Sequence, residues 1–149
     1  VVNVLEMTGA FGAIANNGLL NRPHAISRIL DSSDCPDRND LKTCRVIYSY
    51  DQDPDANKRV LSKNVASTMT QLLRGVITNG TGKGAAIGFG EAGKTGTTDK
   101  NVDLWFIGFI PGRRLATGIW LGNDEIKPTS GSSAQAAQLW GNYMGRIVK

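Results

Sequence analysis

The chain has 149 residues, which suits one compact domain or a part of a larger one. Hydrophobic residues make up 40% and charged residues 20% of the sequence, and no apolar run approaches the roughly 20 residues of a membrane-spanning helix. The net charge of +4 comes from 17 basic and 13 acidic residues scattered along the chain. The sequence has no runs of basic residues, so it does not resemble a nucleic-acid-binding protein. The small positive charge favours anionic substrates only mildly.

The first elements predicted along the chain are a helix and a β-hairpin. Residues 4–17 repeat apolar side chains at helical spacing, and Gly18 follows at the position of a left-handed C-cap. Residues 24–31 and 44–51 are short runs typical of strands, and a segment rich in turn formers separates them. We therefore expect a hairpin with a long polar tip. His24, the only histidine, is expected to be structural or solvated, because a catalytic base needs a nucleophile within reach.

The polar tip can carry both cysteines of the chain, Cys35 and Cys44. They form no C-x-x-C pair and have no histidine nearby in the sequence, so no metal site is expected. A disulfide between them would stabilise the fold by roughly 2 to 3 kcal/mol, but it needs an oxidising compartment. Their spacing alone leaves a disulfide and two free thiols equally open.

The second half of the chain predicts a helix followed by three strands. Ser62 can cap a helix that runs to about Thr78, because apolar residues repeat at helical spacing behind it. Three β-type runs follow at residues 91–97, 103–111 and 114–124, and their short connections allow only antiparallel neighbours. The middle run is apolar on both faces, which places it inside the sheet.

A terminal helix is predicted from the apolar stripe of residues 133–149, and it can cover the sheet. The fold class is therefore α+β, with an antiparallel sheet and packed helices. The large aromatic residues of this half are expected in the core, Trp105 and Phe106 within the sheet, and Trp120, Trp140 and Tyr143 between the last strand and the last helix.

Residues 88–95, GFGEAGKT, match the phosphate-binding pattern G-x-x-x-x-G-K-(S/T), which raises nucleotide binding as an alternative function. That chemistry needs a buried strand before the loop and a helix that begins at the Lys-Thr pair. The preceding residues are rich in glycine, and the following TGTTDKNVD is a poor helix former. The context therefore places Lys94 and Thr95 on a strand.

On a strand, Lys94 and Gly96 project to one face of the sheet, and Thr95 and Thr97 project to the other. If the strand lies at a sheet edge, its free N–H and C=O groups can pair with an extended peptide, and Gly96 allows that peptide to approach closely. Hydroxyls and an ammonium suit the terminal carboxylate of such a peptide. The alternative is an ordinary exposed strand with a solvated lysine.

Four motifs in this order, ANNG, GTG, AGKTGTT and DLWFIGF, resemble the C-terminal half of the transpeptidase domain of class A, bifunctional penicillin-binding proteins. The resemblance covers nearly the whole chain, so residues 1–149 are identified as the C-terminal portion of that domain. It implies a partial version of the serine acyltransferase fold that these proteins share with β-lactamases. It also implies that the parent enzyme cross-links peptidoglycan and is anchored at the periplasmic face of the bacterial inner membrane.

The partners implied by the resemblance are the peptidoglycan stem peptide, β-lactam antibiotics and the N-terminal remainder of the same protein. No cofactor, metal or nucleic acid is implied. The oxidising compartment of such an enzyme also favours the disulfide between Cys35 and Cys44.

The resemblance further implies roles for the Lys-Thr-Gly-Thr strand. Lys94 would be catalytic, because it would place positive charge near the reacting hydroxyls and help to move the proton. Thr95, Gly96, Thr97 and Thr98 would bind substrate, with the hydroxyls of Thr95 and Thr97 on the terminal carboxylate of the stem peptide or of a penicillin. The backbone N–H of Thr97 would be one donor of the oxyanion hole.

The nucleophile of this family is missing from the sequence. No serine is followed three residues later by a lysine, so S-x-x-K is absent and the fragment alone is expected to be inactive. Ser62-Lys63-Asn64 spells the family's S-x-N motif, but we interpret Ser62 as a helix N-cap. Such a fragment could form a homodimer over the surface that its missing half would cover. A noncatalytic peptide-binding module and a phosphate-loop nucleotide-binding protein are the alternative functions.

Overall fold

The computed structural model describes residues 2–148 and contains two compact units. The sheet unit combines the residues up to Leu20 with those from Arg59 onward, and the hairpin unit comprises Asn21–Lys58. Strands β1 (Leu19–Asn21) and β4 (Asn57–Arg59), where the chain passes from one unit to the other and back, pair as a two-stranded sheet.

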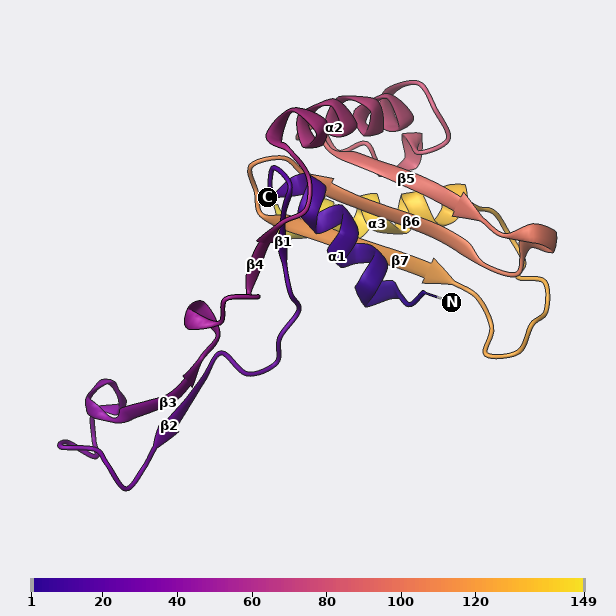
Figure 1. The fold of residues 1–149 in the computed structure, drawn as a ribbon. Helices are drawn as coiled ribbons and strands as arrows, with labels where there is room; N and C mark the ends of the chain where they lie inside the picture. The colour runs from indigo at the N-terminus through magenta and orange to yellow at the C-terminus, as the bar shows by residue number, and fades with distance from the viewer. Residues whose placement is uncertain (1, 149) are drawn as a thin grey trace. The chain divides into compact units, whose positions relative to one another are not determined.

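The sheet unit is built on three antiparallel strands in the order β5-β6-β7 (Figure 1). They are β5 (Ala92–Thr97), β6 (Leu104–Ile110) and β7 (Leu115–Leu121). Strand β6 is buried along nearly its whole length because it is apolar on both faces, which confirms that this run lies inside the sheet. Among the described residues, β5 pairs only with β6, so it is an edge strand.

Helices cover both faces of this sheet. In Figure 1, α1 (Val4–Ala15) lies in front of the sheet and α3 (Ser133–Ile147) lies behind it, while α2 (Lys63–Thr78) packs along β5. Two short 3₁₀ helices, η3 (Lys83–Ala85) and η4 (Asp99–Asn101), precede and follow β5. This arrangement is the predicted α+β fold of an antiparallel sheet with packed helices. Within residues 2–148, none of the helices has the length and apolar character that crossing a bilayer requires.

Local hydrogen bonds define where the helices begin and end. Asn3 and Glu6 form a capping box at the start of α1, in which each side chain accepts the backbone N–H of the other residue. The Ser62 hydroxyl accepts a backbone N–H 3.2 Å away in the first turn of α2, which confirms that Ser62 is an N-cap. Gly18 follows α1 with a φ of +87°, and a Cβ at this position would collide with the carbonyl oxygen of Leu61.

The main hydrophobic core lies between the sheet and α3. Trp140 is fully buried, its ring packs edge-to-face on Phe106 with centroids 5.5 Å apart, and its Nε1 donates to the Thr117 carbonyl oxygen at 3.1 Å. The predicted core position is therefore confirmed for Trp140, but it is wrong for Trp120 and Tyr143, whose side chains are exposed. The buried members of this core are Ile77, Ala85, Phe106, Ile110, Ala136, Ala137, Trp140, Met144 and Val148.

The hairpin unit contains the predicted antiparallel pair, β2 (Arg28–Asp31) and β3 (Arg45–Ser49). The 3₁₀ helices η1 (Leu41–Thr43) and η2 (Tyr50–Gln52) flank β3. The His24 ring stacks on the Tyr50 ring with centroids 3.5 Å apart, which agrees with a structural role for this histidine.

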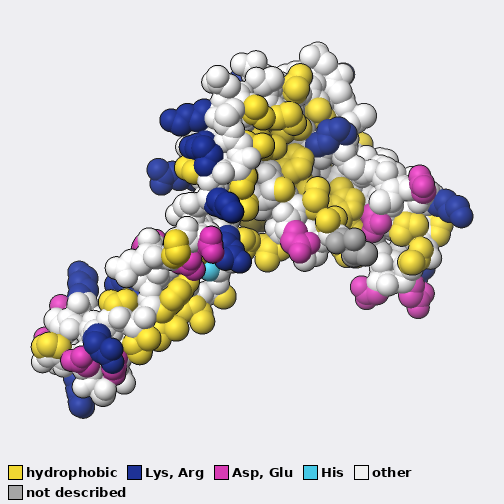
Figure 2. All heavy atoms as spheres, in the orientation of Figure 1, with side chains coloured by type: hydrophobic (Ala, Val, Ile, Leu, Met, Phe, Trp, Pro, Cys, Tyr) yellow, Lys and Arg dark blue, Asp and Glu magenta, His cyan; other side chains and the backbone are white. Residues whose placement is uncertain are grey.

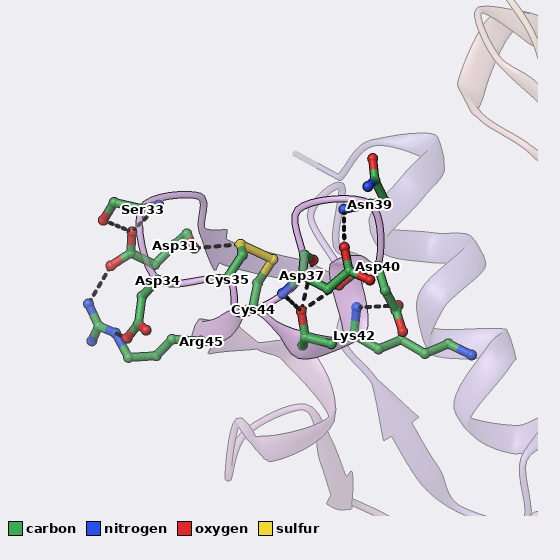
Figure 3. Close-up of a disulfide and its surroundings, with 11 residues drawn as sticks. Asp31, Ser33, Asp34, Cys35, Asp37, Asn39, Asp40, Lys42, Cys44 and Arg45 are labelled. Carbon is green, nitrogen blue, oxygen red and sulfur yellow. Dashed lines mark hydrogen bonds and ion pairs between the residues drawn. A yellow bond between two sulfur atoms is a disulfide. The ribbon is translucent and has the colours of Figure 1, made fainter.

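The tip of the hairpin is closed by a disulfide between Cys35 and Cys44 (Figure 3). Beside it, Arg45 forms ion pairs with Asp31 and Asp34. Hydrogen bonds from the hydroxyl and N–H of Ser33, together with Arg45, lower the pKa of Asp31 to about 2. These ion pairs are exposed and stabilise the tip only weakly, so the disulfide is its main constraint.

Replacing both Cys35 and Cys44 by serine is expected to loosen the tip and to leave the sheet unit intact. In the chain-entropy account, removing a cross-link between residues nine apart in sequence lowers local stability by roughly 2 to 3 kcal/mol. Amide hydrogen exchange should accelerate within residues 31–45 and stay unchanged in β6. Equal acceleration in β6 would show that the disulfide supports the whole chain.

Candidate active site

A groove of about 750 Å³ opens beside β5 on the sheet face that carries α1. Figure 2 shows hydrophobic side chains gathered on the corresponding side of the sheet unit. The groove therefore offers mainly apolar walls, with one ammonium and several hydroxyls concentrated along β5. Its lining comprises Val2, Asn3, Val4, Met7 and Phe11 from α1 and the residues before it, and Lys94–Thr98, Asp103, Trp105, Ile107 and Trp120 from the sheet and its turn.

The register of β5 and β6 decides which side chains face the groove. Lys94 lies opposite Ile107 and Gly96 lies opposite Trp105, and all four residues line the groove. Thr95 lies opposite Phe106, which is fully buried on the α3 side of the sheet. The alternation expected from the sequence is thus present, with Lys94 and Gly96 on one face and Thr95 on the other.

Lys94 is an exposed side chain whose ammonium turns back along its own strand. Its Nζ donates to the carbonyl oxygen of Thr95 at 2.8 Å. Thr95 itself is only 7% exposed, and its hydroxyl oxygen lies 2.5 Å from that of Thr81, in the turn after α2. Nothing in the sequence indicated Thr81 as a neighbour of the strand, because Thr81 and Thr95 are 14 positions apart.

The remaining predicted substrate-binding residues lie at the end of β5. Thr97 is exposed and lines the groove. The Thr98 hydroxyl is already engaged, because it donates to Asp103 Oδ2 at 3.1 Å and accepts from the Asp103 N–H at 2.8 Å. Asp103 also accepts a hydrogen bond from Trp120 Nε1 at 2.9 Å. This carboxylate therefore ties together the turn after β5 and the end of β7.

The aromatic residues divide between the core and the groove. Phe106 is fully buried as expected, but the expected core position is wrong for Trp105, which lines the groove next to Trp120 with ring centroids 6.4 Å apart. Adjacent residues on a strand face opposite sides of the sheet. That alternation was the available signal that Trp105 and Phe106 could not share one environment.

A buried carboxylate that no sequence motif indicated holds the start of β5. Glu91 is 6% exposed, and its side chain accepts the backbone N–H groups of Ile87, Gly88 and Phe89 at 2.6, 3.3 and 2.9 Å. Burial raises the pKa of Glu91, but hydrogen bonds from these three N–H groups and its own outweigh burial and hold the pKa below its ordinary value. The ionised side chain therefore fixes the turn that leads into the strand.

The phosphate-loop interpretation of residues 88–95 is wrong. It requires a helix that begins at Lys94 and Thr95, but these residues lie within β5. The Ser62-Lys63-Asn64 triplet begins α2 and does not line the groove. Within residues 2–148, no three His, Cys, Asp or Glu side chains gather closely enough to hold a metal ion.

Comparison with known families places the whole chain. The family model described as the penicillin binding protein transpeptidase domain matches residues 1–145. The chain belongs to this family. The resemblance inferred from the four sequence motifs is therefore confirmed.

Two relatives illustrate the extent of the similarity. The chain is 32% identical over 145 residues to penicillin-binding protein 1A of Clostridium acetobutylicum, covering 95% of this chain and 16% of that protein. It is 36% identical over 157 aligned residues to penicillin-binding protein 2a of Streptococcus pneumoniae, covering 98% of this chain and 19% of that protein. The chain thus spans less than a fifth of the length of these relatives.

Solved structures show the same fold. The D,D-transpeptidase domain of a peptidoglycan glycosyltransferase from Eggerthella lenta aligns with a TM-score of 0.66 at 27% identity, over 99% of this chain and 33% of that one. Penicillin-binding protein 1A from Haemophilus influenzae aligns with a TM-score of 0.72 at 20% identity, over 99% of this chain and 26% of that one. The expected relation to the penicillin-binding transpeptidase fold is confirmed.

Replacing Glu91 by glutamine tests the role of its charge in the transpeptidase fold. The variant should be less stable near neutral pH. The glutamine N–H₂ group is a donor, and it would face backbone N–H groups whose hydrogen bonds the carboxylate of Glu91 accepts. The pKa of Glu91 is lower in the folded than in the unfolded protein. The ionised carboxylate therefore contributes fully to folding stability at pH values above its pKa in the unfolded protein, and this contribution is lost as the pH falls through its pKa in the folded protein.

Melting temperatures measured from pH 7 to pH 2 should therefore converge for the two proteins at the acidic end. A difference in melting temperature that stays constant over this range would show that the charge of Glu91 is not what holds the turn.

Proposed function

We propose that this chain is the C-terminal portion of the transpeptidase domain of a peptidoglycan D,D-transpeptidase, and that it supplies the substrate-binding strand for serine acyl transfer. The observation that carries the proposal is the position of Lys94 on an edge strand beside the 750 Å³ groove. An edge strand can add an extended peptide by backbone pairing, and the groove gives that peptide's reacting end a partly enclosed place.

The donor stem peptide pairs with the free edge of β5 in this proposal. The Thr97 N–H donates to the oxygen of the reacting carbonyl, where negative charge develops in the transition state. The Thr95 and Thr97 hydroxyls, with Gly96 and Thr98 beside them, receive the terminal carboxylate. A penicillin occupies the same positions, because its carboxylate and strained amide resemble the end of the peptide.

The nucleophile is a serine supplied by the N-terminal remainder of the parent protein. Its Oγ attacks the carbonyl carbon, an ester forms, and the terminal D-alanine leaves with the proton that the serine gave up. The amine of a second stem peptide then attacks the ester, which forms the cross-link and frees the serine. Lys94 supports both steps, because its ammonium lowers the energy of nearby negative charge and helps to move the proton.

The location and partners follow from the same proposal. The parent protein is anchored in the inner membrane and acts at its periplasmic face, where stem peptides and β-lactams reach the groove. The N-terminal remainder of the same chain is its structural partner, and the isolated segment is inactive and can associate as a homodimer. The reaction uses no cofactor.

The proposal predicts that replacing Lys94 by alanine in the full-length protein will slow acylation by a fluorescent penicillin by about 10²-fold or more. The fold should persist, because the Lys94 side chain is exposed and its ammonium donates to the carbonyl of the adjacent residue, Thr95. Labelling rates and circular dichroism measure the two effects. A matched control is Lys83→Ala, which removes an exposed lysine of η3 that does not line the groove.

Labelling of the Lys94 variant at the wild-type rate would show that Lys94 is not catalytic. Stoichiometric peptide binding by the wild-type protein, without labelling by penicillin, would instead indicate a noncatalytic peptide-binding module.

A further inference from the structure

The turn after α2, Gly80-Thr81-Gly82, is held firmly against the sheet. The N–H groups of Gly80 and Gly82 both donate to the Val76 carbonyl oxygen, at 3.1 and 3.0 Å. A Cβ on Gly82 would lie 3.1 Å from the ring of Phe106, so this glycine is in close contact with the residue opposite Thr95. Thr81 is therefore placed beside β5 by backbone bonds and by packing that do not depend on its own side chain.

The hydroxyl of Thr81 is used differently from those on α2. Thr70 and Thr78 donate to carbonyl oxygens one turn earlier, at 2.9 and 3.3 Å, as threonines commonly do within a helix. The Thr81 hydroxyl instead meets the Thr95 hydroxyl at 2.5 Å across a gap of 14 residues. In residues 2–148, Thr81 is the only hydrogen-bond partner of the Thr95 hydroxyl.

The direction of this hydrogen bond matters for an anionic ligand. Each hydroxyl has one proton to donate and two lone pairs that accept. If Thr95 donated to Thr81, its proton would be turned away from any ligand. Thr95 borders the groove, although most of its surface is buried. If Thr81 donates, the proton of Thr95 is free for another acceptor at the groove, and a carboxylate can only accept. A bound carboxylate therefore selects the arrangement in which Thr81 donates to Thr95.

We propose that Thr81 is a positioning residue for carboxylate recognition, because it donates to the Thr95 hydroxyl and thereby directs the Thr95 proton toward the carboxylate of the acyl donor. This inference rests on the proposed function of β5. When Thr81 donates to Thr95 and Thr95 donates to the carboxylate, each hydrogen bond polarises the other. The hydrogen bond from Thr95 to the carboxylate is therefore stronger than it would be without Thr81. Thr81 acts through Thr95 and does not contact the reacting carbonyl.

The proposal makes a distinction by ligand charge. A penicillin with a free carboxylate benefits from the directed proton of Thr95. Its methyl ester lacks the negative charge and gains little from it, although it has the same reactive amide. The contribution of Thr81 should therefore appear with the acid and disappear with the ester, whereas a merely structural role would affect both.

The test uses the full-length protein and measures second-order acylation rate constants with a penicillin and with its methyl ester. Thr81→Val should react roughly 2- to 10-fold more slowly with the acid, as expected for the loss of one hydrogen bond, and at the wild-type rate with the ester. Thr81→Ser keeps the hydroxyl and should restore the rate with the acid. Thr78→Val removes a hydroxyl from the same segment that does not reach β5, and it should leave both rates unchanged.

Several outcomes would overturn the role of Thr81. They are a wild-type rate for Thr81→Val with the acid, an equal loss with acid and ester, and failure of Thr81→Ser to restore the rate. If Thr81→Val does not fold, the smaller variant Thr81→Ala takes its place in the same comparison. The proposed function fails separately, and this inference with it, if the wild-type protein is not acylated by either compound.

Discussion

The antiparallel pairing of β5 with β6 is the constraint on which the rest of the site depends. Strand β6 is buried on both faces, so it provides a rigid template for its neighbour. The register of this pair points Lys94 and Gly96 into the groove and places Thr95 opposite Phe106, while Thr95 still borders the groove. The same pairing leaves the other edge of β5 without a strand among the described residues. The hydrogen bonds between β5 and β6 therefore position the side chains of β5 and also leave its other edge available to a peptide.

Polar contacts hold β5 at its two ends and near its middle. Glu91 binds the backbone of the turn that precedes the strand, and Asp103 binds Thr98 in the turn that follows it. Between them, Thr81 reaches Thr95 from the end of α2. A strand with glycine at two of its six positions buries few side chains of its own. These polar contacts keep its position defined while its groove face stays unobstructed.

The chain belongs to the penicillin-binding transpeptidase family. In our proposal, binding groups and nucleophile come from segments far apart in the parent sequence, and the groove is where they meet. The hairpin unit is a separate elaboration with its own disulfide and contributes no residue to the groove lining. Sequence variation at the hairpin tip can thus be tolerated without a direct effect on β5.

The sequence alone determined the elements that depend on local periodicity and capping. These include α2 with its Ser62 cap, the hairpin, and the three strands with β6 in the middle. Hydrophobic repeats and turn residues encode such features within short segments. Four motifs in order, ANNG, GTG, AGKTGTT and DLWFIGF, also indicated the family, and the residues that follow Lys94 excluded the helix of a phosphate-binding loop.

Only the tertiary structure decided which side of the sheet each aromatic residue occupies and which polar groups hold β5. Trp105 and Phe106 are equally apolar in sequence, yet one lines the groove and the other lies in the core because α1 and α3 cover opposite faces. The contact between Thr81 and Thr95 and the burial of Glu91 depend on how distant segments pack together. The local sequence pattern does not predict such contacts, because they arise from the packing of separate elements and not from the hydrophobic periodicity within one element.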